Sequence, residues 1–385
     1  MKERSILTGR HFMHGDDACA EGAIAAGCKF FGGYPITPST EVAERLALRL
    51  PEVGGVFIQM EDELGSFASV IGASAAGVRS MTATSGPGLS LMMENLGLAV
   101  MMEIPCVLVD IQRGSPSTGL PTLAGQSDVM QVRWGSHGDY AIVAYSPWSP
   151  QEMFDLTIHA FNIADRYRLP VVLLSDEVIG HMVERVIIPE ADEIPRWPRK
   201  RPENPPNGMF MAFKPDSSDL VPPMAYAGEG YNVHFTGLTH DQRGYPAMTA
   251  DDHQMLITRL IGKVHQNLEN ILSYEEYFLE DASIIVVSFG CTARSARRAV
   301  KLARERGVPA GLFRLVSIWP FPEEQIRELA ERVDSFIVAE LNLGQVAREV
   351  ERIIYRPVRG VFHAGGAMIP PEPIFDLIME ASKDG

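Results

Sequence analysis

Hydrophobic and polar positions follow two kinds of pattern along the first 180 residues. Short apolar or β-branched runs predict strands, and longer stretches with apolar residues three or four positions apart predict helices. Strands are expected at Phe30–Tyr34, Val56–Met60, Ser80–Thr84, Cys106–Ile111, Tyr140–Tyr145 and Val171–Ser175. Helices are expected between several of them, at Asp62–Ala76, Leu89–Met102 and Gln151–Arg166. This alternation predicts an α/β fold, a doubly wound parallel sheet with helices on both faces.

Residues 191–253 interrupt the pattern. They include PRWPRKRPENPPNG and PDSSDLVPPMAYAGEGYN, which are rich in proline and glycine and show no sustained periodicity. Such a composition predicts a connection between domains, and its aromatic residues predict that it is ordered against another part of the protein. The chain is therefore predicted to contain a first domain (1–190), the connection (191–253) and a smaller second domain (254–385).

Strand and helix patterns return in the second domain. Strands are expected at 282–290, 310–321 and 335–342, and helices at 292–307, 321–333 and 345–355. The second domain is thus expected to be α/β as well.

Composition and charge narrow the function. The chain of 385 residues is 46% hydrophobic and carries a net charge of −15, which disfavours a nucleic-acid partner because no basic stripe is available for phosphates. No apolar run reaches the roughly 20 residues that cross a bilayer, and the start MKERSILTGR lacks a secretory leader. We expect a cytoplasmic protein that contacts no membrane.

The four cysteines are scattered through the chain. None forms a CxxC pair, and no cysteine–histidine group has the spacing of a zinc or iron–sulfur site. We expect no metal centre on this chain.

The segment FFGGYPITPST (30–40) leads from a strand into a helix. Pro35 and Pro38 hold the preceding residues Tyr34 and Thr37 extended, and Ser39 or Thr40 can cap the following helix. A rigid polar loop at the C-terminal end of a strand is where open α/β sheets bind ligands. The alternative is a plain strand-to-helix connection.

Three acidic residues begin the next helix, in QMEDELGSFASVIGASAAG (59–77). The helix dipole favours acids in a first turn, so simple capping would explain them. A carboxylate beside small, closely packed residues can instead be poorly hydrated and hold a proton near neutrality. Because three adjacent acids cannot all point the same way, we expect one to face the crevice and the others to face solvent.

Two more strand ends carry candidate residues. TATSGPGLS (82–90) places glycines where a flat or anionic ligand could approach backbone N–H groups. Arg113 follows the strand PCVLVDIQ, and its guanidinium suits a carboxylate, although pairing with Asp128 or Asp139 at the surface is an equal alternative. All these loops lie at C-terminal ends of predicted parallel strands and can share one crevice.

GYPITPST, QMEDELGSFASVIGASAAG, TATSGPGLSLMMENLG and the arginine after the fifth strand resemble the α subunit of 2-oxoacid:ferredoxin oxidoreductases, most closely the 2-oxoglutarate synthase α chain of multi-subunit enzymes. The resemblance covers the whole chain, including GLTHDQRG (237–244), AGLFRLVSIWPFP (310–322) and AELNLGQ (339–345). It implies a pyrimidine-binding domain for thiamine diphosphate, followed by a transketolase C-terminal-like domain.

The resemblance also implies roles for single residues. Glu63 matches the glutamate that hydrogen-bonds the aminopyrimidine of the cofactor and promotes loss of the thiazolium C2 proton, with Glu61 as its rival. Thr37 matches the threonine that contacts the substrate, and Arg113 the arginine that binds its carboxylate. Besides Glu63, the cofactor-binding residues are expected to be Tyr34, Pro35, Ser85 and Gly86.

Family features that this sequence lacks imply partner chains. GDD (15–17) is the nearest approach to the GDG motif that holds the diphosphate and Mg²⁺, and no asparagine follows before Asn95. Mg²⁺ and [4Fe-4S] clusters are therefore expected on partner subunits: a β subunit, a separate γ subunit and a ferredoxin-like δ subunit.

The implied reaction is CoA-dependent oxidative decarboxylation of 2-oxoglutarate to succinyl-CoA, or the reverse, with electrons passing to ferredoxin. Alternatives are a subunit specific for branched-chain 2-oxoacids such as 2-oxoisovalerate, or a non-catalytic scaffold of the same fold. A nicotinamide-dependent dehydrogenase is disfavoured because no GxGxxG motif follows the first strand.

Overall fold

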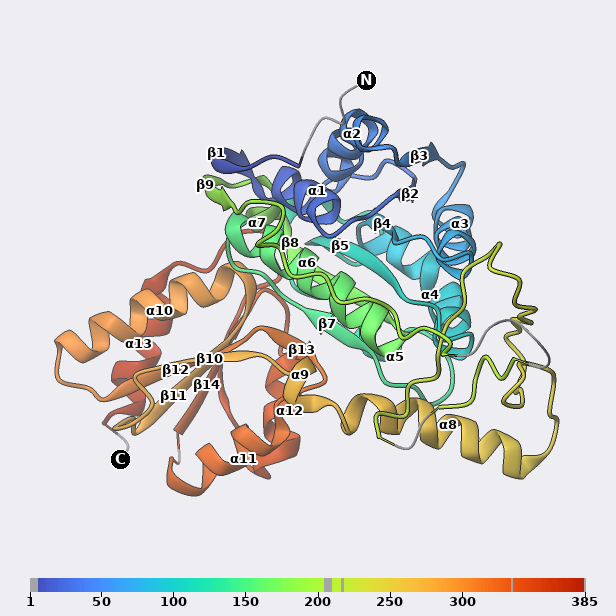
Figure 1. Ribbon diagram of the computed structural model, residues 1–385. Coiled ribbons are helices and arrows are strands. Elements are labelled where there is room, and N and C mark those ends of the chain that lie inside the picture. The colour runs from blue at the N-terminus through green and yellow to red at the C-terminus, as the bar shows by residue number, and fades with distance from the viewer. Residues whose placement is uncertain (1–5, 204–209, 216–217, 334, 384–385) are drawn as a thin grey trace.

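The computed structural model describes residues 6–203, 210–215, 218–333 and 335–383. Two sheets form separate parts of the molecule (Figure 1). The larger sheet has the strand order β13-β7-β8-β5-β4-β2-β3, with β6 paired to β5 outside this row. Its strands in chain order are β2 (Phe30–Gly33), β3 (Val56–Gln59), β4 (Ser80–Thr84), β5 (Cys106–Gly114), β6 (Leu120–Ala124), β7 (Val143–Tyr145), β8 (Pro170–Asp176) and β13 (Ser317–Trp319).

Helices cover both faces of this sheet, and its central strands are therefore buried on both sides. Along β8, Val171 and Leu173 pack with one hydrophobic cluster, whereas Val172 and Leu174 pack with the other. The first face is covered by α1 (Gly15–Ala25), α2 (Thr40–Arg49) and α6 (Pro150–Tyr167). The second is covered by α3 (Glu63–Ala75), α4 (Gly86–Met101) and α5 (Val129–Trp134).

Six strands of this row, β3, β2, β4, β5, β8 and β7, are parallel to one another. Strand β6 pairs antiparallel with β5, and β13 pairs antiparallel with β7. Strand β2 lies between β3 and β4 in the sheet. The chain runs from β2 to β3 on one side of β2 and then crosses to β4 on its other side. The C-terminal ends of β2 and β4 therefore form a switch point, the place where open α/β sheets bind ligands.

The predicted doubly wound sheet is confirmed, with shifts at several element ends. The helix predicted from Leu89 begins at Gly86, because Pro87 and the two glycines fit a first helical turn. The predicted strand 310–321 is wrong as one element: it is divided into β12 (Ala310–Leu315) and β13, which belong to different sheets. The run AGLFRLVSIWPF has only Arg314 and Ser317 among its apolar residues before Pro320, and neither is a turn signal that would mark such a change of sheet.

The second sheet has the order β10-β12-β11-β14-β15. Its strands are β10 (Tyr274–Tyr277), β11 (Ile284–Ser288), β12, β14 (Ser335–Glu340) and β15 (Arg359–Phe362), and only β10 runs antiparallel to its neighbour. Helices α10 (Gly290–Glu305) and α13 (Pro371–Ala381) cover one face, and α11 (Glu323–Arg332) and α12 (Gln345–Ile354) the other. This second α/β unit was also predicted.

The remaining elements are short or lie at the edges: β1 (Gly9–His14), the 3₁₀ turn Pro51–Val53, α7 (Glu177–His181), β9 (Val183–Ile188), α8 (Ala250–His265) and α9 (Leu268–Ile271). Strands β1 and β9 form a separate antiparallel pair. In the part of the chain that is described, no helix is long and apolar enough to cross a membrane.

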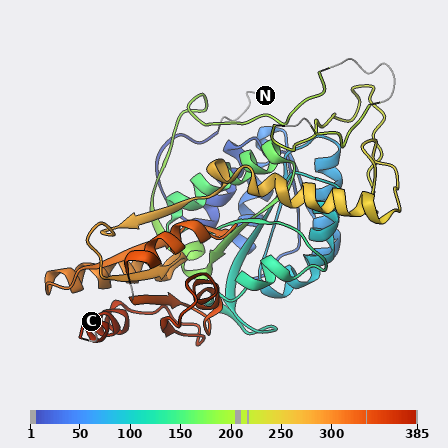
Figure 2. The ribbon, with the colours of Figure 1, turned by 90° about the horizontal axis from the view of Figure 1, so that it is seen from below.

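The segment between β9 and α8 first crosses α6, where Asn162 donates to the Pro195 carbonyl at 2.8 Å, and its later part, coloured yellow-green, lies beside the end of the first unit that carries α3 and α4 (Figure 1 and Figure 2). Buried guanidinium groups hold it there: Arg199 pairs with Asp165 at 2.6 Å, and Arg168 Nη1 donates to the carbonyl of Ala212 at 2.7 Å. The predicted connection is thus ordered in the residues that are described, while 204–209 and 216–217 lie outside them. The predicted domain boundaries stay a prediction.

Candidate functional site

Glu63 is the first residue of α3, just beyond the C-terminal end of edge strand β3. Asp62 caps this helix, since its Oδ1 accepts a hydrogen bond from the N–H of Gly65 at 2.7 Å. Glu61 and Asp62 are exposed, whereas Glu63 is only 6% exposed. Of the three consecutive acids, Glu63 is therefore the one that turns inward.

The start of α4 lies directly against Glu63. A Cβ added at Gly88 would lie 2.6 Å from Glu63 Oε1 and 2.1 Å from Thr84 Oγ1, so only glycine allows this approach. The hydroxyls of Thr84 and Ser85 are buried and have no hydrogen-bond partner among the described residues. Buried hydroxyls are rarely left without a partner, so this corner suits a polar ligand.

Arg113 lies within β5, which continues to Gly114, so the prediction that the strand ends before Arg113 is wrong. The side chain is 5% exposed, which excludes the alternative of a surface arginine. Its Nη1 donates a hydrogen bond to the carbonyl oxygen of Thr37 at 2.7 Å, and its Nε has no partner among the described residues. Burial lowers the pKa of Arg113, while the nearby carboxyls of Asp128 and Asp110 act in the opposite direction.

The loop after β2 meets Arg113 through its backbone. The side chains of Tyr34, Pro35 and Thr37 are exposed, and it is the Thr37 carbonyl, not the hydroxyl, that contacts the guanidinium. Ser39 is the N-cap residue of α2, but its hydroxyl donates to the carbonyl of Ile36 at 2.9 Å instead of capping the helix. The loop is closed by its own hydrogen bonds and by Arg113.

Asp110 is a second charged residue of β5, and it faces Asp128 at the start of α5. Burial raises the pKa of Asp110 well above its usual value, and the neighbouring Asp128 raises it further. Burial also raises the pKa of Asp128 to about 6, although Asp110 and Arg113 oppose this. Like charges this close cannot both ionise easily, so the two carboxyls hold a proton near neutral pH.

Sequence reasoning missed this carboxyl pair. All nine residues of β5 are buried, and its sequence CVLVDIQRG contains Asp110, Gln112 and Arg113. Charged and amide side chains inside a strand that is otherwise fully apolar are a usable signal, because a buried charge needs a partner or a function. Asp128 was considered only as a possible surface partner of Arg113.

The N-terminus of α4 lies between the two groups of side chains. On one side are Glu63, Thr84 and Gly88, and on the other are Arg113 with the carboxyl pair, since a Cβ at Gly86 would lie 3.7 Å from Asp128 Oδ2. The structure therefore brings Glu63, Arg113 and the start of α4 to one edge of the sheet. Tyr34 and Pro35 lie exposed at its rim.

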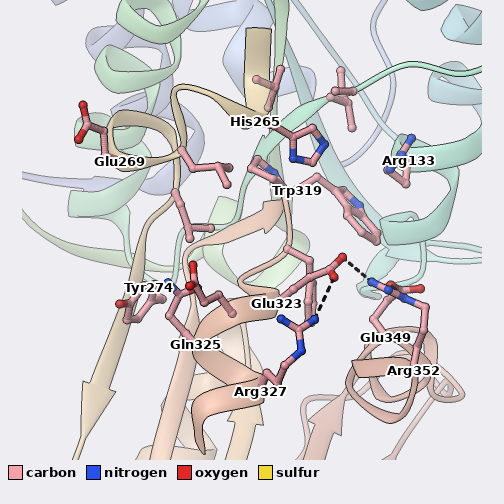
Figure 3. A pocket seen from close by; sticks show the side chains of 18 of the residues that line it. Arg133, His265, Glu269, Tyr274, Trp319, Glu323, Gln325, Arg327, Glu349 and Arg352 are labelled. Atoms are coloured by element: carbon pink, nitrogen blue, oxygen red, sulfur yellow. Dashed lines mark hydrogen bonds and ion pairs between the residues drawn. The ribbon is translucent and has the colours of Figure 1, made fainter. Parts of the chain in front are cut away.

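A separate cavity of about 970 Å³ lies where α5 meets the second α/β unit (Figure 3). Arg133, Trp319, Glu323 and Arg352 are among the residues that line it, and none of the predicted site residues does. Glu323 pairs with Arg352 at 2.6 Å, and its other oxygen lies 3.8 Å from Arg327. These three ion-paired residues belong to α11 and α12, whereas Arg133 belongs to α5, so the cavity lies at the junction between the two units and away from the predicted site residues.

Comparison with known proteins identifies the family. The sequence profile described as pyruvate flavodoxin/ferredoxin oxidoreductase, thiamine diP-bdg, matches residues 21–259. The profile of the pyruvate:ferredoxin oxidoreductase core domain II matches residues 282–374. This chain belongs to the 2-oxoacid:ferredoxin oxidoreductases.

Curated members of the family are similar over nearly the full length. The 2-oxoglutarate synthase subunit KorA of Methanothermobacter marburgensis is 53% identical over 97% of this chain and 99% of the relative. The KorA subunit of Methanocaldococcus jannaschii is 51% identical over 94% of this chain and 97% of that protein. The ketoisovalerate oxidoreductase subunit VorB of Methanothermobacter thermautotrophicus is 36% identical over 97% and 98%. The predicted family is confirmed.

Solved structures agree on the fold. The 2-oxoglutarate:ferredoxin oxidoreductase of Magnetococcus marinus, with 2-oxoglutarate, coenzyme A and succinyl-CoA bound, superposes with a TM-score of 0.92 at 33% identity. This alignment covers 97% of the present chain but 65% of that chain. A split-gene transketolase gives a TM-score of 0.54 at 12% identity over 96% of both chains, which supports the fold alone. The predicted fold class is confirmed, and the first unit is a thiamine diphosphate-binding domain of this family.

Proposed function

We propose that this chain forms half of the active site of a 2-oxoglutarate:ferredoxin oxidoreductase, which converts 2-oxoglutarate and CoA to succinyl-CoA and CO₂ and passes two electrons to ferredoxin. One observation carries the proposal: a buried glutamate and a buried arginine converge on the start of α4, at the switch point of a thiamine diphosphate-binding domain. Identities of 51–53% to 2-oxoglutarate synthase subunits, against 36% to a ketoisovalerate oxidoreductase subunit, favour 2-oxoglutarate over a branched-chain substrate.

The residues present fit thiamine diphosphate. The buried, unpaired hydroxyls of Thr84 and Ser85 and the glycine surface at Gly86 and Gly88 leave polar atoms and backbone beside Glu63. We assign Glu63 to the aminopyrimidine, which it hydrogen-bonds and supplies with a proton. The remaining predicted contacts, Tyr34 and Pro35, lie at the rim and are proposed to touch the cofactor from there. When bound, the cofactor supplies the nucleophilic carbon for the 2-oxo group and accepts the electron pair released with CO₂.

Arg113 is proposed to bind the C1 carboxylate of the substrate. Its Nη1 is held by the Thr37 carbonyl, which fixes the plane of the guanidinium, while Nε is free of protein partners among the described residues. A planar cation held in this way can orient a carboxylate through charge-assisted hydrogen bonds. The exposed hydroxyl of Thr37 is proposed to contact the same substrate from the loop.

The rest of the active site is proposed to come from a β subunit. The chain has four cysteines, all buried singly and unpaired, and its sequence contains no GDG motif. We therefore assign Mg²⁺, the diphosphate contacts and the [4Fe-4S] clusters to partner subunits. These partners are the β subunit, a γ subunit and a ferredoxin-like δ subunit. The exposed apolar side chains of Tyr34, Leu64 and Leu91 lie on the loop after β2, on α3 and on α4, the elements that carry the proposed site, and suit a protein surface that covers it.

The test is an assay of the intact complex that contains this chain. Purified complex should reduce a low-potential dye in the presence of CoA and 2-oxoglutarate, and analysis should find thiamine diphosphate. Higher kcat/KM with 2-oxoisovalerate would replace the proposed substrate by the branched-chain one. A complex without thiamine diphosphate, or without activity on any 2-oxoacid, would leave only the scaffold role.

A further inference from the structure

A group of acceptor atoms behind the loop 34–40 is not used by the proposed reaction. Asp16 on α1, Glu41 on α2 and His181 on α7 place one ligand atom each within 4.8 Å of the others. The carbonyl oxygen of Pro38 accepts a hydrogen bond from His181 Nε2 at 3.2 Å and joins the group. Four segments of the chain therefore converge on one point.

Asp16 is the least expected member of this group. Its side chain has no solvent exposure, and neither carboxylate oxygen has a hydrogen-bond partner among the described residues. Gly180 leaves the room for this carboxylate, since a Cβ there would lie 2.7 Å from Asp16 Oδ1. A buried carboxylate normally pairs with hydrogen-bond donors or coordinates a metal.

The distances from His181 Nε2 to the carboxylates of Asp16 and Glu41 match ligands around an ion better than direct hydrogen bonds. His181 Nε2 lies 3.8 Å from Asp16 Oδ2 and 3.5 Å from Glu41 Oε2. Direct charge-assisted hydrogen bonds would measure roughly 2.7–2.9 Å. Two ligands bound tetrahedrally to a zinc-sized ion, with bonds of about 2.1 Å, are separated by about 3.4 Å.

Glu177 orients the histidine for such a role. It lies one helical turn before His181, and its Oε1 is 3.4 Å from Nδ1. A carboxylate on one ring nitrogen fixes the tautomer and turns the lone pair of the other nitrogen outward, as in many zinc sites. His181 Nε2 donates a proton to the Pro38 carbonyl, and a metal ion bound here would take the place of that proton among three carboxylates and a carbonyl.

We propose that Asp16, Glu41, His181 and the Pro38 carbonyl form a binding site for one divalent metal ion of the zinc class. The imidazole ligand favours Zn²⁺ or Co²⁺ over Mg²⁺ and Ca²⁺, which prefer oxygen ligands alone. Such an ion clamps the backbone next to Thr37 to α1, α2 and α7. It is separate from the Mg²⁺ that accompanies the cofactor and from the proposed catalysis, and the following test measures no turnover.

The experiment is a titration of the tag-free full-length chain after chelator treatment and dialysis. Calorimetry with Zn²⁺ should show one saturable site per chain, and Co²⁺ should produce visible absorption bands with the same stoichiometry. Asp16→Asn, which removes the buried carboxylate with little change in shape, and His181→Gln should abolish this site. Glu177→Gln should weaken Zn²⁺ binding by about 10- to 100-fold, as expected for the partner of a ligating histidine.

His14→Gln is the matched control. His14 is the last residue of β1 and pairs with Asp17 at 3.6 Å, so it is a histidine–carboxylate pair outside the group. Its removal should leave binding unchanged. Thermal unfolding of the metal-free variants checks that they are folded. If His181→Gln is not folded, Asp16→Asn alone provides the test. Absence of a saturable site in the wild-type chain, or unchanged binding in folded Asp16→Asn, would overturn the proposal.

Discussion

At the scale of single residues, burial distinguishes groups that look alike in the sequence. Glu61 and Glu63 are two positions apart, but only Glu63 is buried, against the start of α4. Arg113 differs from an ordinary surface arginine because both its environment and one of its hydrogen bonds are provided by distant segments. Chemical roles therefore follow from position in the sheet and not from residue type alone.

Glu63→Gln should reduce the turnover of the assembled complex by about 10²–10⁴-fold, because an amide cannot supply the proton that a general acid–base group provides. Glu61→Gln is the matched control, since the exposed side chain should contribute little. Dye-reduction assays with 2-oxoglutarate measure both. If Glu61→Gln proves the more harmful variant, the assignment of Glu63 is wrong.

Arg113→Ala should lower kcat/KM by roughly 10- to 1,000-fold, which is the effect of losing an oriented charge-assisted contact in a shielded site. Thr37→Val should have a smaller effect because it removes only an uncharged hydrogen bond. Arg113→Ala should affect 2-oxoglutarate and 2-oxoisovalerate about equally, since both have a C1 carboxylate. A loss limited to 2-oxoglutarate would mean that Arg113 binds its distal carboxylate.

The carboxyl pair predicts a pH dependence of stability. The pKa of Asp128 is raised to about 6 in the folded chain, so between about pH 4 and 6 the folded state binds more protons than the unfolded state. The contribution of this group to stability is therefore complete at low pH and is lost as the pH rises through 6.

Asp128→Asn removes this titration. The side chain of Asp128 accepts no capping hydrogen bond from α5, so the substitution removes no helix cap. Relative to wild type, the variant should gain free energy of unfolding as the pH rises from 5 to 7.5. Urea unfolding at both pH values gives the difference. A relative loss over this range would show that the ionised Asp128, paired with Arg113, is the stabilising form.

At the scale of elements, the site depends on how closely α4 approaches α3. Gly88 has no room for a side chain, because a Cβ would contact Thr84 and Glu63, whereas Gly72 in the middle of α3 has no atom within 4 Å of such a Cβ. The same residue type thus has a steric requirement at one position and none at the other.

Gly88→Ala should displace the carboxylate of Glu63 and lower turnover by about 10²-fold, the cost of a misplacement of about 1 Å. Gly72→Ala should leave turnover unchanged and slightly stabilise the helix. Circular dichroism should show both variants folded, so the assay reports on the site. Equal activity of the two variants would contradict the proposed contact.

At the scale of the whole molecule, two α/β units are joined by more than a linker. Strand β13 of the C-terminal half completes the first sheet, and Trp319 Nε1 donates to the carbonyl of Val129 at 2.9 Å. Helix α8 is fastened to the first unit by buried Glu103, which pairs with Arg259 and Lys263 at 2.6 and 2.7 Å. The proposed site lies on the first unit, and exposed apolar side chains lie on the loop and helices that carry it.

The isolated chain should therefore fold but show no turnover with 2-oxoglutarate and CoA and only weak binding of thiamine diphosphate. Adding the β subunit should restore both activities, because the diphosphate, Mg²⁺ and cluster contacts are assigned to it. Calorimetry with thiamine diphosphate and dye-reduction assays, with and without the β subunit, provide the measurement. Steady-state activity of the chain alone would refute the division of the site.

The alternation of apolar runs was enough to predict a parallel α/β sheet, because a strand buried on both faces is rich in consecutive apolar residues, as the run PVVLL of β8 is. The prolines and glycines around Thr37 and Gly86 likewise marked strand-to-helix turns from local conformational restrictions alone. The family resemblance added the choice of Glu63 and Arg113, which local patterns left open.

Only the tertiary structure decided what depends on contacts between distant segments. The split of 310–321 between two sheets follows from competition between partners that lie far away in sequence. The pairing of Asp110 with Asp128, and the convergence of Asp16, Glu41 and His181, join residues from separate elements. Periodicity reports which face of an element is buried, but which side chains meet there is set by the packing of whole elements.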